Sequence, residues 1–229
     1  FIHQSWTIKV LIPNQPRDDQ RRLPDIEGLV NHRIIQANAI EKSSVSSTIS
    51  KINTMERVSI IEGKKPILFV SPHVPEEIHT DVIAVELADA TDGYAVINRG
   101  WERSEYVDQF NDKANCNNIT HCLEDVVKDE FLDPIMKFTS RLVKKHGFCY
   151  IINIHGMGND IREQIKDNVD IVLGYGNGEP PSHTCETWRK DAFTHLLNDC
   201  GLLTYQAKAK GKYSARRKTL SGQIITFPC

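Results

Sequence analysis

Three residues whose side chains bind metal ions lie directly after two predicted strands. His73 and Glu76 belong to the sequence Ser-Pro-His-Val-Pro-Glu-Glu, which follows the apolar run 67–70. His155 follows the run 148–154, the most apolar strand-like segment of the chain. A histidine and a glutamate three residues apart can turn onto one zinc ion, and a second histidine completes the His₂Glu set of known zinc hydrolases. Taken singly, such residues are more commonly part of a solvated loop or a hydrogen-bonded core.

Positively charged residues at two places could hold an anionic substrate. Arg99, preceded by Asn98, ends a predicted strand, and a guanidinium can form two parallel hydrogen bonds with a carboxylate. Arg216 and Arg217 lie in the run 208–218, which holds six Lys or Arg and no acid. That run could be a solvated loop, a nucleic-acid contact or a loop that reaches an anionic substrate. Its single tyrosine is thin support for base stacking.

The elements that must position these residues alternate along the chain. Strands are predicted at 57–61, 67–71, 94–98, 148–154, 169–173, 202–206 and 223–227, with helices at 80–90, 123–146 and 185–200. We expect Thr80 or Asp81 as the N-cap of the first helix, Gly147 after the second, and Ser182 or Thr184 as the N-cap of the third. Strands that alternate with helices predict an α/β fold with a mostly parallel or mixed sheet.

The composition favours a folded protein over a general nucleic-acid binder or a membrane protein. The 229 residues carry 28 Lys plus Arg and 30 Asp plus Glu, a formal charge of −2, whereas nucleic-acid binders usually have a basic excess. No run approaches about 18 apolar residues, so no membrane span is expected. Six cysteines without a CxxC pair predict reduced thiols and a cytoplasmic location.

Two regions are expected along the chain. Residues 1–55 form an N-terminal extension of uncertain structure, with a predicted strand at 6–12 and a Ser-rich joint at 41–50. Residues 56–229 form the α/β domain that carries the candidate site.

The order of the motifs resembles the N-formylglutamate amidohydrolase family and, more distantly, the zinc carboxypeptidase-like hydrolases. The likeness covers roughly residues 58–228 and rests on strand–Ser71-Pro72-His73, an apolar helix, Ile97-Asn98-Arg99 and strand–Asn153-Ile154-His155-Gly156. It implies a three-layer α/β/α sandwich of the phosphorylase/hydrolase type with a mixed central sheet. It also implies one catalytic zinc ion, with His73 and His155 as ligands and Glu76 as the third. Glu77 competes with Glu76 for that place.

The same resemblance implies roles for the other candidates. Arg99, with Asn98, would hold the substrate carboxylate, and the region of Arg216 and Arg217 would face the substrate. Family-like sequences have a general base, a Glu beyond the last strand, which the printed sequence does not reach. Glu186 is the internal candidate for that role. Many members also have a small Ser-Gly or Thr-Gly pair where this chain has Val-Pro after the first histidine.

The function that follows is zinc-dependent hydrolysis of an N-acyl, formyl-like amide of an acidic amino acid such as glutamate. The expected partner is therefore a small acidic substrate. Two alternatives remain open: a zinc peptidase that acts on γ-glutamyl or C-terminal acidic peptides, and a non-catalytic protein of the same fold that binds an anion through the basic run.

Overall fold

A mixed sheet forms the centre of the computed structural model, which describes residues 2–11, 52–54, 57–74, 77, 79–100, 128–157, 164–165, 169–175, 184–208 and 213. Within these residues the sheet has eight strands: β1 (Ile2–Leu11), β2 (Ile52–Thr54), β3 (Val58–Ile61), β4 (Ile67–Ser71), β5 (Tyr94–Asn98), β6 (Phe148–Met157), β7 (Ile171–Gly174) and β8 (Thr204–Gln206). The helices are α3 (Thr80–Thr91), the short π-helix η2 (Lys128–Leu132), α5 (Asp133–His146) and α7 (Thr187–Asp199).

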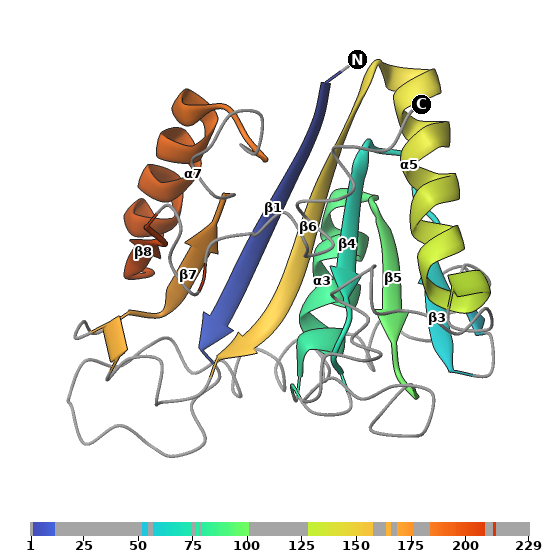
Figure 1. Ribbon diagram of the computed structural model, residues 1–229, viewed down its shortest axis with the longest axis horizontal. Coiled ribbons are helices and arrows are strands. Elements are labelled where there is room, and N and C mark those ends of the chain that lie inside the picture. Colours follow the sequence, from blue (N-terminus) through green and yellow to red (C-terminus); the bar gives the residue numbers. More distant parts are fainter. Residues whose placement is uncertain are drawn as a thin grey trace, which may run out of the picture.

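Four neighbouring strands run parallel and form the middle of the sheet (Figure 1). The strand order is β2-β3-β5-β4-β6-β1-β7-β8, and β4 pairs in parallel with both β5 and β6. β1 pairs in parallel with β6, while β3 and β7 add antiparallel strands on the two sides. The predicted mixed α/β fold is therefore confirmed, and β6 is a central strand, as its apolar sequence indicates.

The first strand lies inside the sheet. The strand predicted at 6–12 is found as β1, between β6 and β7. Thirteen residues from the expected N-terminal extension, ten in β1 and three in β2, therefore belong to the same sheet as strands from 56–229. The boundary expected after residue 55 does not separate two sheets.

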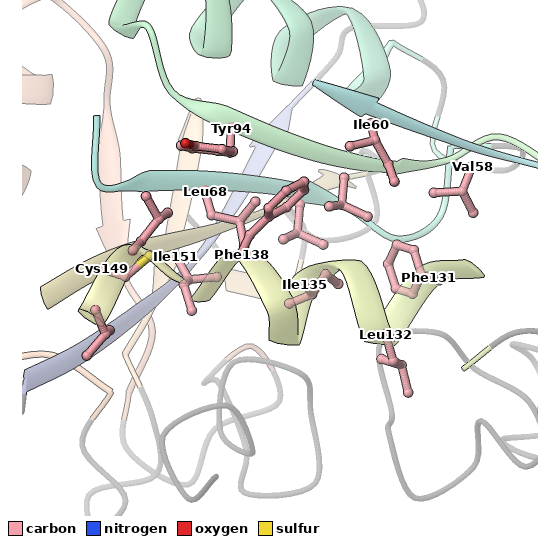
Figure 2. Packing of buried hydrophobic residues seen from close by; sticks show 14 residues of the cluster. Val58, Ile60, Leu68, Tyr94, Phe131, Leu132, Ile135, Phe138, Cys149 and Ile151 are labelled. Carbon is pink, nitrogen blue, oxygen red and sulfur yellow. The ribbon is translucent and has the colours of Figure 1, made fainter. Parts of the chain in front are cut away.

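Helix α5 covers one face of the central strands (Figure 2). It begins at Asp133 with Pro134 in its first turn, where a missing N–H costs nothing. Its buried side chains and those of η2 form one apolar cluster with the strands: Val58, Ile60, Leu68, Val70, Tyr94, Val96, Phe131, Leu132, Ile135, Phe138, Leu142, Val143, Cys149 and Ile151. Full burial of each large apolar side chain contributes about 1.5–3 kcal/mol, so this cluster fixes β4, β5 and β6 relative to one another.

Helix α3 covers the opposite face of the same strands. β4 leads through α3 to β5 on one side, and β5 leads through α5 to β6 on the other side of β4. Such crossovers are right-handed, so two that travel in opposite directions place their helices on opposite faces. Side-chain alternation agrees, because Phe69 and Ile97 pack with Ala84 and Ala88 of α3 in a second cluster.

The crossover from β4 through α3 to β5 also separates β3 from β4, because it places β5 between them. The sequence places a turn at residues 62–65 between these two strands, but β5 lies between them in the sheet. Gly63 in that turn packs against the turn that follows α3, where Lys64 and Lys65 donate their N–H groups to the Asp92 carbonyl at 2.7 and 2.9 Å.

The start of α3 differs from the sequence prediction. Its N-cap is His79, at a left-handed φ of 68°, and not Thr80 or Asp81. Thr80 is buried, and its hydroxyl donates a hydrogen bond of 2.8 Å to the Glu77 carbonyl. The Thr80 hydroxyl therefore links the start of the helix to Glu77.

The other helix ends confirm one prediction and correct another. Gly147 follows α5 at φ 81°, and its N–H donates to the Val143 carbonyl, as the glycine signal predicts. The N-cap of α7 is Glu186 rather than Ser182 or Thr184. Thr184 lies before the helix and is buried, and its N–H donates to the carbonyl of Tyr175, the residue after β7. Ser182 lies outside the described residues.

Two further predictions fall partly or wholly outside the described residues. They are the first five residues of the helix predicted at 123–146 and the strand predicted at 223–227. Among the described residues, each helix is too short or too polar to cross a membrane.

Candidate metal centre

The candidate site lies at the point in the sheet where the strands that follow β4 are added first on one side of it and then on the other. β4 continues to β5 on one side, and β6 lies on its other side. In open α/β sheets, ligands bind in the crevice outside the carboxyl ends of the two strands at such a point. His73 follows β4 by two residues, and His155 is the third residue from the end of β6. Parallel pairing of β4 and β6 therefore brings the two histidines to the same edge.

A single backbone turn places Glu77 beside His73. The Glu77 N–H donates to the His73 carbonyl at 2.8 Å, which closes one helical turn. Side chains four residues apart on such a turn lie on the same side. The His73 Nδ1 atom is accordingly 3.2 Å from Glu77 Oε1.

His155 contacts the same carboxylate from the neighbouring strand. Its Nδ1 atom lies 3.3 Å from Glu77 Oε1 and 3.2 Å from Oε2. Its side chain is 2% exposed, and its ring centroid is 5.0 Å from that of His73. Both imidazoles therefore present Nδ1 to one carboxylate group, and Glu77 Oε1 is within reach of both.

The backbone of Gly156 also contacts the Glu77 carboxylate. Its N–H donates a hydrogen bond of 3.1 Å to Glu77 Oε2. A Cβ at this position would lie 3.0 Å from Glu77 Cβ and 3.4 Å from Glu77 Cα. The missing side chain is what lets the Glu77 segment approach the strand this closely.

The surroundings keep Glu77 ionised. Burial is the largest influence on its pKa and on its own would raise it. The charge and hydrogen bond of His155, followed by those of His73, outweigh burial and hold the pKa of the Glu77 carboxyl well below its usual value of 4.5. A metal ion would take the place of the imidazole protons, because only a neutral imidazole nitrogen and an ionised carboxylate can be its ligands.

The donor set and its spacing fit a divalent metal ion. One ligand atom from each of His73, Glu77 and His155 can be chosen so that all lie within 4.8 Å of one another. Bonds of about 2.0–2.2 Å in a tetrahedral site place neighbouring ligand atoms about 3.4 Å apart. The observed Nδ1–Oε separations of 3.2 and 3.3 Å are close to that value. Two nitrogens and one oxygen suit zinc better than magnesium or calcium.

The other predicted ligand, Glu76, lies outside the described residues. Glu77, the competing candidate, is the carboxylate that the structure brings to both histidines.

Asn98 and Arg99 lie at the end of β5, next to β4. Asn98 is 1% exposed, and its Nδ2 atom donates a hydrogen bond of 2.8 Å to the Pro72 carbonyl. Arg99 donates from Nε to the Ser59 hydroxyl at 2.8 Å and from a terminal nitrogen to Asp81 at 2.5 Å. The structure therefore bonds Asn98 to the residue before His73, and it bonds Arg99 to β3 and to the first turn of α3.

Glu186 is not brought to the histidines. Its carboxylate forms an ion pair of 2.8 Å with Arg189, whose guanidinium contacts the Tyr150 hydroxyl. Tyr150 is the third residue of β6, and a strand rises about 3.3 Å per residue, so His155 lies about 17 Å further along. Glu186 is thus tied to the amino end of β6, away from the candidate centre at its carboxyl end.

The predicted substrate-facing residues Arg216 and Arg217 lie outside the described residues. Comparisons of the chain with models of known protein families, with curated proteins and with solved structures each find no match.

Proposed function

We propose that this protein is a zinc-dependent amidohydrolase that cleaves an N-acyl amide of an acidic amino acid, as its resemblance to the N-formylglutamate amidohydrolases implies. The observation that carries the proposal is the convergence of His73, Glu77 and His155 at the carboxyl ends of β4 and β6. The packing of α3 and α5 on opposite faces of the sheet supports the three-layer sandwich that the same resemblance implies.

In this proposal His73, His155 and Glu77 hold one zinc ion. Bound zinc supplies Lewis acidity, which lowers the pKa of a coordinated water towards about 7 and polarises a substrate carbonyl. The Glu77 carboxylate offsets part of the cation's charge, and the Gly156 N–H donates a hydrogen bond to the Oε2 atom of that carboxylate. The low exposure of His155 restricts how far its ring can move, so the donor atoms stay preorganised.

Metal content per chain is the first test. Purified wild type should hold about one zinc ion per chain, and His73→Ala should lose it. His195→Ala is the matched control, because His195 is an exposed histidine on α7, outside the three-residue cluster, and should keep the metal. Wild type that binds no zinc after zinc is added back would overturn the proposal.

The substrate class needs a second test, on protein shown to hold zinc. A panel of N-formyl amino acids and short acidic peptides should be turned over with preference for the formyl derivatives of glutamate and aspartate. Preference for the peptides would favour the peptidase alternative. Stoichiometric binding of the acidic compounds without turnover would favour a binding protein.

A further inference from the structure

We propose that Asn98 and Arg99 are positioning residues, which fix the two ends of the segment that carries His73 and Glu77. This inference rests on the proposed metal-binding function and assigns these two side chains a role other than contact with substrate. Asn98 is the last residue of β5, a strand that is buried along its whole length and pairs with β4, and Arg99 follows it directly as an exposed residue. The end of the buried strand β5 thus lies beside the end of β4, which leads to His73.

Asn98 holds the beginning of the segment. Its Nδ2 atom donates to the carbonyl of Pro72, the residue immediately before His73. The bond spans 26 residues of sequence and is buried, so it is screened from competition by water. Loss of the donor would leave the Pro72 carbonyl without this bond in a buried place, which favours movement of the backbone that aims the His73 ring.

Arg99 holds the end of the segment. Its guanidinium donates to Asp81, which lies in the first turn of α3, four residues after Glu77. A second hydrogen bond to the buried hydroxyl of Ser59, on β3, fixes the guanidinium itself. Within that first turn, Thr80 is bonded to the Glu77 carbonyl through its hydroxyl and its N–H. The position of Glu77 is therefore coupled to the ion pair through a short, hydrogen-bonded stretch.

The same contacts argue against Arg99 as the primary carboxylate binder. The Asp81 carboxylate is 2.5 Å from the guanidinium and neutralises its charge, so an incoming anion is attracted less strongly. A substrate-binding arginine would affect substrate affinity and leave zinc affinity unchanged. A positioning residue would weaken zinc binding before any substrate is added.

Zinc affinity, measured by competition with a chromophoric chelator, tests this assignment. We expect Asn98→Asp to lower the affinity about 10–100-fold, the range for residues that orient metal ligands. Arg99→Gln should lower it several-fold, and Asp81→Asn, which still accepts a hydrogen bond, should lower it less. With cobalt as the probe, the visible absorption bands of the first two variants should differ from those of wild type, since ligand geometry changes.

Arg141→Gln is the matched control. Arg141 forms an ion pair of 2.8 Å with Glu62 and has about the same side-chain exposure as Arg99, but it belongs to α5. This variant loses a comparable bond and should keep wild-type zinc affinity and cobalt spectrum. If Asn98→Asp fails to fold, Arg99→Gln and Asp81→Asn still decide the matter, because both side chains are partly exposed.

The outcomes separate this inference from the proposed function. Wild type that binds no zinc overturns both. Wild type that binds zinc, with Asn98 and Arg99 variants that bind it as tightly as the Arg141 control, overturns the positioning role alone. In that case a raised KM in the Arg99 variant would identify it as a substrate-binding residue.

Discussion

Gly156→Ala should weaken zinc binding without unfolding the protein, because Gly156 lies directly behind the Glu77 side chain. The added methyl carbon would be 3.0 Å from Glu77 Cβ and 3.5 Å from Glu77 Cγ. Ordinary van der Waals contact begins at 3.4 Å, so Glu77 must shift by about 0.4 Å. Ligand distances in metal sites vary by only about 0.2 Å, so this shift moves the carboxylate out of register with the two imidazoles.

The expected loss of zinc affinity is about 10–100-fold, which corresponds to about 1.4–2.7 kcal/mol of binding free energy. Titration against a chromophoric chelator at neutral pH measures it. Thermal unfolding of the metal-free variant measures the accompanying loss of stability, for which overpacking predicts about 1–3 kcal/mol.

Gly147→Ala is the control for a general loss of stability. Gly147 precedes β6 at the end opposite to His155, and its φ of 81° disfavours any residue with a Cβ. The substitution should cost about 1–2 kcal/mol of stability and leave zinc affinity unchanged. If Gly156→Ala binds zinc as tightly as Gly147→Ala does, the close approach of Gly156 does not set the position of the ligand, and the reasoning is refuted.

Two further predictions concern a tightly packed turn and a buried thiol. At Gly63, a Cβ would lie 2.3 Å from the carbonyl oxygens of Asp92 and Gly93, so Gly63→Ala should lower the free energy of unfolding in urea by about 2–4 kcal/mol; a loss below about 1 kcal/mol would contradict this. Burial raises the pKa of the Cys149 thiol to about 12, so iodoacetamide should modify the exposed Cys200 in the native protein and reach Cys149 only after denaturation, as mass spectrometry of the peptides would show. Because that pKa exceeds the unfolded value of 9.0, the stability it contributes is full below pH 9.0 and is lost as the pH rises towards 12. Native modification of Cys149 as fast as that of Cys200 would refute its burial.

Local sequence patterns predicted most of the regular elements. β4 and β5 have the predicted bounds, and β6 begins at the predicted residue, because runs of apolar residues between turn signals specify buried strands without reference to the rest of the chain. The glycine after α5 was equally predictable, since glycine readily adopts the left-handed conformation that ends this helix. His73 and His155 were identified for the same reason, because each lies at the predicted end of an apolar run, although β6 continues two residues beyond His155.

The sequence did not determine which groups these side chains would meet. Two neighbouring carboxylates were open as the third ligand, and the contact of Glu77 with both histidines depends on the backbone turn after β4 and on the glycine after His155. The partners of Arg99 come from β3 and α3, 40 and 18 residues away. A strand pattern carries no information about such distant neighbours, although a glycine next to a strand-end histidine is a readable signal of close approach.

The amino-acid sequence by itself determined the alternation of strands and helices and the presence of two histidines and nearby carboxylates after strands. Tertiary structure decided the strand order, with β1 inside the sheet and β5 between β3 and β4. It also decided that Glu77 lies with the histidines, while Glu186 is tied to the far end of β6. The physical reason is that periodicity reflects the burial of neighbouring side chains along the chain. Pairing order and side-chain contacts depend instead on the crossovers and apolar packing that join distant segments.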